Sequence, residues 1–225
     1  TLVDRQDPLL TSVRPRILVV DDDEAILRMF STLFTRNGYE VRTASDGVSG
    51  LEMTRVEPFD LILADLNMPY LDGWGMLRLI REDFATREIP VAFVSAHDDY
   101  RESLKALDAG AQGYLSKGTR LESLVAQVKQ LLHARDEARV LFAEHRPTAI
   151  DLAAVGSQWI LRQLSAQNES GVLSARDGWC QYQIGFVSGA CVFANAVAGK
   201  FSASGETALT AYVASRGSEG FWSPN

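Results

Sequence analysis

The chain has 225 residues, which is long for one domain and comfortable for two. Its apolar and charged contents, 46% and 23%, are ordinary for a globular protein, and no apolar run reaches the roughly 18 residues of a membrane-spanning helix. The net charge of −7 disfavours a nucleic-acid binder, which needs a basic face, and because residues 1–13 form a tail without the apolar segment of a signal peptide, we expect a cytoplasmic protein.

Strand and helix patterns alternate through the first half of the chain. The expected strands are continuous apolar runs rather than alternating ones, and the segments between them repeat apolar residues at helical spacing. Such a pattern predicts a parallel sheet covered on both faces, a doubly wound α/β domain over residues 14–133. The expected strands are 16–20, 39–44, 61–64, 90–94 and 112–116, and the expected helices are 26–34, 46–55, 73–82, 99–109 and 121–133.

The last of these helices has no firm stop at residue 133. Residues 134–146 contain no Gly or Pro, and Pro147 is the first breaker. We therefore expect a helical linker over residues 134–147. A coiled contact between two copies and a solvated charged tether are both compatible with its sequence.

Residues 148–225 differ in composition and predict a small α+β domain. A helix is expected at 151–165, strands at 171–173, 179–187, 191–194 and 220–222, and a helix at 205–215 capped by Ser204. This segment has neither a winged-helix pattern nor a basic balance, which disfavours a DNA-binding output. Its acidic residues Asp151, Glu169, Asp177, Glu206 and Glu219 outnumber its basic residues Arg162, Arg176, Lys200 and Arg216.

The polar residues of the first domain gather where its strands end. Asp21 and Asp22 follow the first strand, Asp65 ends the third, Ser95 ends the fourth and Lys117 follows the fifth. Ligands of open parallel sheets bind at this carboxyl edge. Carboxylates grouped there repel one another unless a hard cation joins them, and Mg²⁺ suits such oxygen ligands.

The remaining chemistry of this edge is suited to phosphoryl transfer. Ser95 and Lys117 would hold a tetrahedral anion opposite the metal, and a carboxylate at Asp65 can form an acyl phosphate. The loop at Asn67 would turn a main-chain carbonyl toward the metal, and Gly73 would let the chain enter the next helix. These expectations make Asp65 the phosphoryl acceptor.

Four sequence blocks carry a resemblance to the response-regulator receiver domain over about residues 14–135: ILVVDDDE, LILADLNMPYLDG, VAFVSAHDD and AGAQGYLSKG. The resemblance implies a five-stranded sheet of flavodoxin-like order with Asp65 as the phosphorylated residue. It implies that Asp22, Asp65 and the carbonyl of Asn67 ligate Mg²⁺ directly, with Asp21 acting through water. Ser95 and Lys117 would then bind the phosphoryl oxygens.

The same resemblance assigns further roles and shows one departure. Ser95 and Tyr114 match the positions that move on activation, and Asn67 and His97 match positions that tune the lifetime of the phosphate. The family usually has Pro after the lysine, whereas this chain has Gly118. Because glycine permits several backbone shapes, Lys117 is expected to be less tightly preset.

The second domain is similar to the PATAN family of bacterial interaction modules over about residues 148–223. The similarity rests on the Gly171-Val172-Leu173 strand, the hairpin QYQIGFVSGACVFANA and the segment SGETALTAYVASRGSEGFW. It implies a protein-interaction module without catalysis. Its residues Trp159, Trp179 and Trp222 are either interface anchors or core residues.

Together these patterns predict a bacterial two-component response regulator. A sensor histidine kinase is the expected phosphodonor, an unidentified protein the expected downstream partner, and no enzymatic activity is expected beyond self-catalysed phosphorylation and dephosphorylation. A homodimer would use either the face of the fourth helix, fifth strand and fifth helix or the linker helix. Two alternatives remain open: a phosphorylation-independent adaptor with a degenerate receiver, and a Mg²⁺-dependent aspartyl-phosphate phosphatase. The second lacks a carboxylate two residues after Asp65, where such phosphatases place their acid/base.

Overall fold

A computed structural model describes residues 14–96, 100–215 and 219–225, and the chain divides into two compact units, Arg14–His133 and Ala134–Asn225. Each unit has its own buried core. Across the described residues, no helix is both long and apolar enough to cross a membrane.

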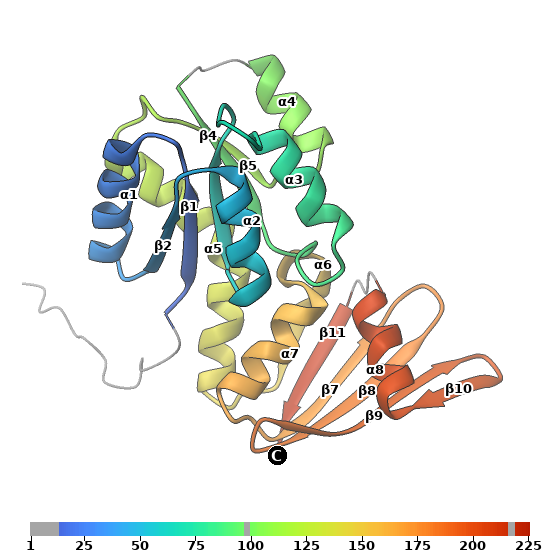
Figure 1. Ribbon diagram of the computed structural model, residues 1–225. Coiled ribbons are helices and arrows are strands. Elements are labelled where there is room, and N and C mark those ends of the chain that lie inside the picture. Colours follow the sequence, from blue (N-terminus) through green and yellow to red (C-terminus); the bar gives the residue numbers. More distant parts are fainter. Residues whose placement is uncertain (1–13, 97–99, 216–218) are drawn as a thin grey trace, which may run out of the picture. The chain divides into compact units, whose positions relative to one another are not determined.

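The N-terminal unit is a parallel sheet with helices on both faces, as predicted (Figure 1). The strand order is β2-β1-β3-β4-β5, and every neighbouring pair is parallel. Its strands are β1 (Arg16–Val20), β2 (Glu40–Ala44), β3 (Leu61–Asp65), β4 (Val91–Ser95) and β5 (Gly113–Ser116), and its helices are α1 (Glu24–Arg36), α2 (Gly47–Val56), α3 (Gly73–Glu82), α4 (Tyr100–Asp108) and α5 (Leu121–Ala143).

Alternate residues of the central strands enter two different cores. Leu18 of β1 and Ile62 of β3 pack with residues of α2, α3 and α4, whereas Ile17 and Leu61 pack with residues of α1 and α5. A strand that is buried on both faces has no solvent side to mark with polar residues. This explains why the strands of this unit read as continuous apolar runs.

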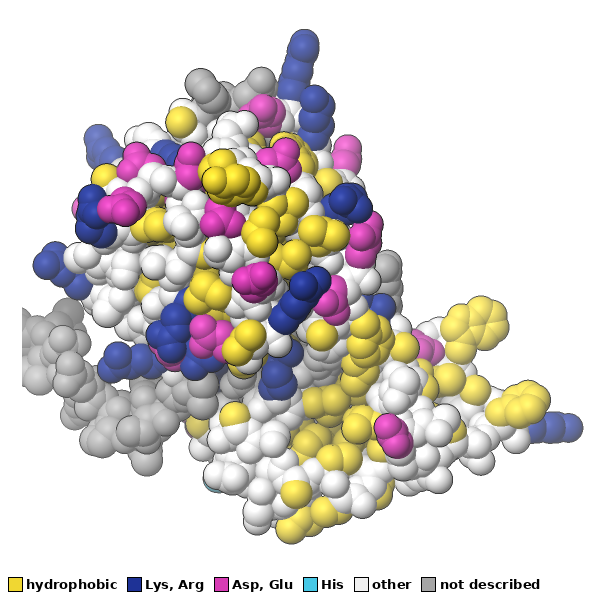
Figure 2. Space-filling view, viewed as in Figure 1, with side chains coloured by type: hydrophobic (Ala, Val, Ile, Leu, Met, Phe, Trp, Pro, Cys, Tyr) yellow, Lys and Arg dark blue, Asp and Glu magenta, His cyan; other side chains and the backbone are white. Residues whose placement is uncertain are grey.

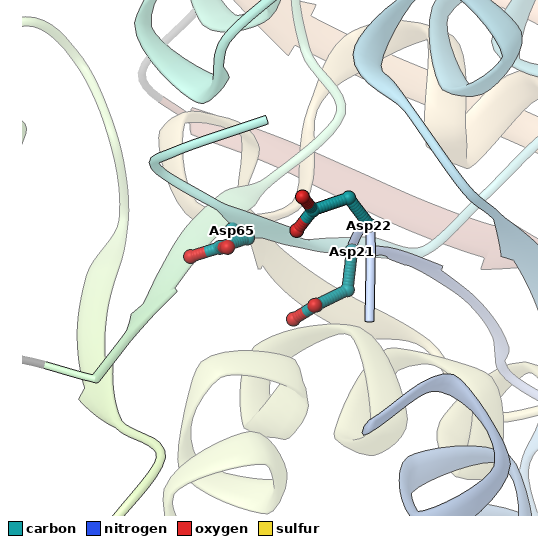
Figure 3. A group of neighbouring side chains, drawn as sticks. All are labelled: Asp21, Asp22 and Asp65. Carbon is teal, nitrogen blue, oxygen red and sulfur yellow. The ribbon is translucent and has the colours of Figure 1, made fainter. Parts of the chain in front are cut away.

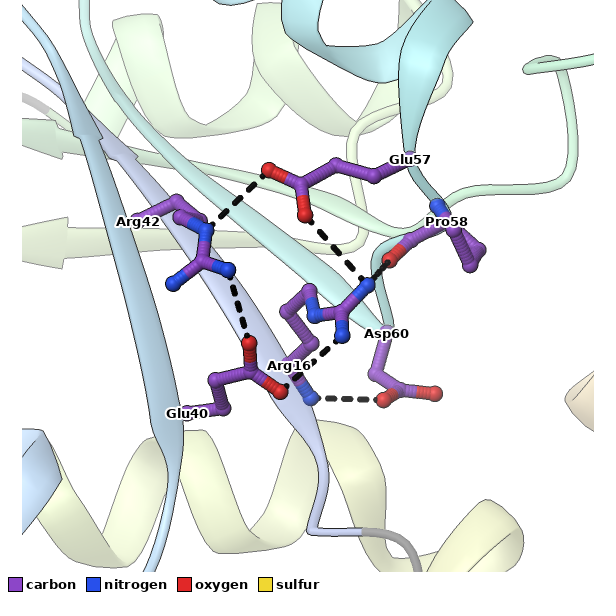
Figure 4. A network of polar contacts seen from close by, with 6 residues as sticks. All are labelled: Arg16, Glu40, Arg42, Glu57, Pro58 and Asp60. Atoms are coloured by element: carbon purple, nitrogen blue, oxygen red, sulfur yellow. Dashed lines mark hydrogen bonds and ion pairs between the residues drawn. The ribbon is translucent and has the colours of Figure 1, made fainter.

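Charged side chains hold together the amino edge of this sheet, where β1 and β2 begin. Arg16 and Arg42 alternate with Glu40 and Glu57 in a closed ring of ion pairs with distances of 3.0 to 3.4 Å. The main-chain amide of Arg16 also donates to Asp60 Oδ2 at 2.7 Å, and Figure 4 shows the whole network. The ring neutralises its own charges and fixes the strand ends opposite the carboxyl edge.

The C-terminal unit contains a six-stranded antiparallel sheet of order β10-β9-β8-β7-β11-β6. Residues of α5, α7 and α8 share one core with the inward side chains of this sheet. Its strands are β6 (Thr148–Asp151), β7 (Gly171–Arg176), β8 (Gln181–Val187), β9 (Ala190–Ala198), β10 (Phe201–Ser204) and β11 (Glu219–Pro224), and its helices are α6 (Leu152–Val155), α7 (Ser157–Ala166) and α8 (Gly205–Ala214).

Three details of this unit differ from the sequence-based prediction. The single helix expected at 151–165 is two helices, because the chain turns at Gly156 with φ +90°, a conformation that favours glycine. Strands β6 and β10 were not predicted. Ser204 is the N-cap residue of α8, as expected, but its side chain makes no capping hydrogen bond.

The segment expected to be a linker, residues 134–147, instead belongs to the C-terminal unit. Helix α5 continues to Ala143, and its residues Ala138 and Phe142 are buried in the C-terminal core. The ring of Phe142 meets that of Trp222 edge to face at 6.2 Å. The prediction missed this burial because a helical stripe does not reveal what it packs against.

Candidate functional site

The predicted site residues come together at the carboxyl edge of the parallel sheet. Asp65 is the last residue of β3, Ser95 is the last residue of β4, and Asp21 directly follows β1. The order β1-β3-β4 makes these three strands neighbours, so their ends deliver the side chains to one place.

Three carboxylates form the centre of the site. One oxygen of each of Asp21, Asp22 and Asp65 lies within 4.8 Å of the others, close enough for one metal ion. Figure 3 shows Asp21 and Asp22 projecting from the end of β1 and Asp65 from the end of β3. Asp21 and Asp65 are buried, whereas Asp22 is exposed. Two of the three candidate metal ligands are therefore buried, and the third faces solvent.

Asp23, the third residue of the acidic triplet, has a structural role. Its side chain accepts a hydrogen bond of 2.7 Å from the amide of Ala25 and caps α1. Its own amide donates to Asp21 Oδ1 at 3.0 Å. Asp23 thus starts the helix and orients the neighbouring carboxylate.

Lys117 supplies the positive charge of the site. Its Nζ lies 2.6 Å from Asp21 Oδ2 and 3.1 Å from Asp65 Oδ2. Burial raises the pKa of Asp21, although the hydrogen bond from Lys117 opposes this effect. Burial alone would lower the pKa of Lys117, but its contacts with the two carboxylates outweigh burial and raise it. The lysine is therefore held as a cation.

Backbone hydrogen bonds lie on both sides of Gly118. The amide of Lys117 donates to the carbonyl of Ser95 at 2.7 Å, and the amide of Thr119 donates to the carbonyl of Ser116 at 3.0 Å. Gly118 is not among the glycines with positive φ, and a Cβ there would meet only Ser116 Oγ at 3.6 Å. The turn is thus hydrogen-bonded and unstrained at Gly118, and the looser presetting of Lys117 stays a prediction.

Gly73 shapes the loop after Asp65 for a reason that the sequence did not reveal. A Cβ at Gly73 would lie 2.3 Å from the carbonyl oxygen of Asp65. The amide of Gly73 donates to the carbonyl of Leu66 at 3.0 Å. Asp65 Oδ1 accepts a 2.8 Å hydrogen bond from the amide of Leu66. Helix α3 therefore begins so close to the main chain of Asp65 that only glycine fits.

The remaining predicted residues lie in different surroundings. Asn67 is exposed in the loop two residues after Asp65. Tyr114 is half-buried in β5, and its hydroxyl donates to Glu102 Oε2 of α4 at 3.0 Å. Ser95 is buried at the end of β4. His97 lies outside the described residues.

The sequence matches the response regulator receiver domain family over residues 17–129. It is 37% identical over 123 residues to the "DNA-binding dual master transcriptional regulator RpaA" of Synechocystis, covering 54% of this chain and 51% of the relative. It is 40% identical over 116 residues to the response regulator PleD of Caulobacter vibrioides, covering 52% of this chain and 26% of the relative. The alignments thus span about half of the length of RpaA and about a quarter of the length of PleD.

Solved structures show the same likeness. The receiver domain of the Francisella response regulator 1452 is 32% identical with a TM-score of 0.50, covering 55% of this chain and 99% of that one. The CheY-like receiver domain protein of Methanospirillum hungatei is 28% identical with a TM-score of 0.51, covering 56% of this chain and 99% of that one. Both likenesses span about half of this chain and nearly the whole of the solved one.

Proposed function

Since this chain belongs to the response regulator receiver domain family, we propose that Asp65 accepts a phosphoryl group from a sensor histidine kinase and that the C-terminal unit carries the resulting signal. The observation that carries the proposal is the contact of Lys117 with both Asp21 and Asp65 at the end of the parallel sheet. In the transfer, an oxygen of Asp65 forms a bond to phosphorus while the bond from phosphorus to the donor breaks.

The donor set fits Mg²⁺, which prefers a few carboxylates together with water. Asp22 and Asp65 would ligate it directly with the carbonyl of Asn67, and Asp21 would act through water. When bound, the metal would neutralise charge on the phosphoryl oxygens. The ammonium of Lys117 would leave Asp65 Oδ2 and contact one oxygen of the phosphoryl group. The hydroxyl of Ser95 would bind a second phosphoryl oxygen.

The added charge of roughly −1.5 to −2 gives phosphorylation its effect on the fold. We propose that Ser95 and Lys117 move toward the phosphoryl group and that Tyr114 responds by leaving its contact with Glu102. This would change the surface formed by α4, β5 and α5, through which two copies or a partner would associate. Asn67 and His97 would set how long the phosphate survives.

We propose that the C-terminal unit is a PATAN-type protein-interaction module and does not bind DNA. Two observations support this. The expected hairpin turn lies at Ser188-Gly189 between β8 and β9, and Figure 2 shows few charged side chains and no basic cluster on the visible face over β8, β9 and α8. RpaA is described as DNA-binding, but its alignment covers only 54% of this chain.

A phosphorylation assay tests the proposal. The purified chain is incubated with Mg²⁺ and acetyl phosphate, and intact-mass spectrometry measures the gain of one phosphoryl group. We expect wild type to gain it and Asp65→Asn to lose it. Asp72→Asn is the matched control on the same loop, because Asp72 caps α3 and Asn also caps. Equal labelling of Asp65→Asn and wild type would contradict the assignment.

Beryllofluoride, which mimics the phosphoryl group, tests whether the signal changes assembly. Light scattering coupled to size exclusion is run with Mg²⁺ on wild type and Asp65→Ala. A change of mass or shape in wild type alone supports a switch, whereas identical behaviour of both favours the phosphorylation-independent adaptor.

A further inference from the structure

The antiparallel sheet of the C-terminal unit has a groove on the face opposite its core. Side chains alternate along each strand, so Trp222 and Ile184 point into the core while Phe221, Gln181 and Gln183 line the groove. The groove has a volume of about 1070 Å³ and extends from β6 across β11, β7 and β8 to β9. This size is at the upper end of ordinary ligand sites.

The floor of the groove combines one aromatic ring with uncharged amides. Phe221 is 47% exposed, so about half of its surface is open to a ligand in the groove. Gln183 lies directly opposite Asn195 on the neighbouring strand, and both are exposed. Such a floor offers an apolar contact flanked by hydrogen-bond donors and acceptors, the composition of an interaction surface.

The charges at one end of the groove leave an acidic excess. Arg176 forms an ion pair with Glu219, its cross-strand partner, so these two charges offset one another. Asp151, which lies opposite Glu219 on β6, is exposed and its charge is not balanced by that pair. A basic ligand would complement this end.

An exposed tryptophan lies at the same end of the sheet. Trp179 is 89% exposed in the turn between Arg176 and Gln181, both of which line the groove. Its backbone is fixed, because Asp177 accepts hydrogen bonds from the amides of Trp179 and Cys180 at 2.7 Å each. A large aromatic side chain on a fixed turn is the residue type that most often anchors a protein partner.

We propose that this groove binds an amphipathic helix of a partner protein, with an apolar stripe over Phe221 and Lys or Arg side chains beside Asp151. A helix is 10–12 Å across, so half the volume of four turns is roughly 1000 Å³, which matches the groove. A second copy of the same concave face would leave a void, which close packing disfavours. The inference rests on the proposed function in one respect, which is that the C-terminal unit is taken as the part that carries the signal to a partner.

The test uses the full unphosphorylated chain and two fluorescein-labelled helical peptides of about 15 residues, roughly four turns. Both carry the same leucine stripe, with lysine on the other face of one and glutamate on that of the other. Fluorescence anisotropy measures binding. The lysine peptide should bind, the glutamate peptide should not, and Phe221→Ser should weaken binding about tenfold, as loss of an interface anchor does.

Two variants separate the groove from general attraction to an acidic protein. Phe201→Ser removes a phenylalanine that is 83% exposed and does not line the groove, so it should leave the affinity unchanged. Asp151→Asn should weaken binding about threefold while keeping the cap of α6, because Asn also caps. Acrylamide quenching of Trp179 should fall when the lysine peptide binds.

Three outcomes would overturn the proposal. The first is equal affinity of wild type and Phe221→Ser, and the second is equal binding of the two peptides. The third is a concentration-dependent dimer that Phe221→Ser abolishes without any peptide binding, which would assign the groove to a second copy. Because the chain is unphosphorylated throughout, none of these results depends on whether Asp65 is phosphorylated.

Discussion

The ammonium of Lys117 lies 2.6 Å from Oδ2 of Asp21, a carboxylate that is 1% exposed. A buried carboxylate without a partner is costly, and breaking such a pair leaves one charge uncompensated. The same ammonium contacts Asp65 at 3.1 Å. Lys117 therefore offsets the charge of two buried acids, Asp21 and Asp65, at once.

Replacement of Lys117 by Met should destabilise the metal-free protein by about 3 kcal/mol, because Asp21 and Asp65 would then repel each other without a cation. Millimolar Mg²⁺ should restore part of this loss by supplying positive charge. Urea unfolding with EDTA and with Mg²⁺ measures both effects. Lys129→Met, the same change at an exposed position of α5, should cost less than about 0.5 kcal/mol. Equal losses for the two variants would contradict the role of Lys117.

The close approach at Gly73 predicts a strong effect of one methyl group. Gly73→Ala would place a Cβ 2.3 Å from the carbonyl oxygen of Asp65, and backbone shifts of this kind cost about 1–3 kcal/mol. The shift should also slow phosphorylation, since it displaces Asp65, the proposed acceptor. Gly178→Ala is the control, because its Cβ would meet nothing within 4 Å. Normal labelling of a folded Gly73→Ala variant would show that the acceptor tolerates the displacement.

The N-cap of α2 predicts a pH dependence of stability. Hydrogen bonds from the amides of Ser49 and Val48 hold the pKa of Asp46 below its usual range. A carboxyl group with a lowered folded-state pKa stabilises the protein above its unfolded pKa, and this stability is lost as the pH falls through the folded value. Asp46→Ala should therefore cost about 1 kcal/mol at pH 7 and progressively less below about pH 4.

The control for this prediction is Asp46→Asn, which keeps a capping side chain but cannot titrate. The stability of Asp46→Asn above that of Asp46→Ala should stay constant with pH, whereas the stability of wild type above that of Asp46→Ala should fall as the pH falls. Denaturant unfolding of all three proteins, from pH 7 to below about pH 4, measures their free energies of unfolding for this comparison. A gap between wild type and Asp46→Ala that does not change with pH would mean that the carboxylate charge adds nothing to the cap.

The parallel sheet and its site could be predicted because their signals are local. Each strand is a short apolar run, and each site residue directly follows or ends one, so Asp21, Asp65 and Lys117 could be placed together without knowing any contact. Gly73 shows where this reasoning stops. Its position at a helix start was evident, but its contact with Asp65 depends on how α3 approaches β3.

The C-terminal unit was less predictable because its signals depend on packing. Strands β6 and β10 have four residues each, too few to show a reliable alternation, and they lie at the two edges of the sheet. The three tryptophans of this unit also look alike in the sequence. Trp159 and Trp222 are buried in the core, whereas only Trp179 of the three is exposed, so only it fits the role of an interface anchor.

The second half of α5 offers the clearest test of where the two units divide. Phe142 is fully buried in the C-terminal core, whereas Val140 on the same helix is 43% exposed. Phe142→Ala should destabilise this unit by about 3–5 kcal/mol, and Val140→Ala should cost less than about 1 kcal/mol. Urea unfolding followed by tryptophan fluorescence reports on this core, because it contains Trp159 and Trp222. A solvated tether would instead tolerate both changes equally, and that result would return residues 134–143 to the role of a linker.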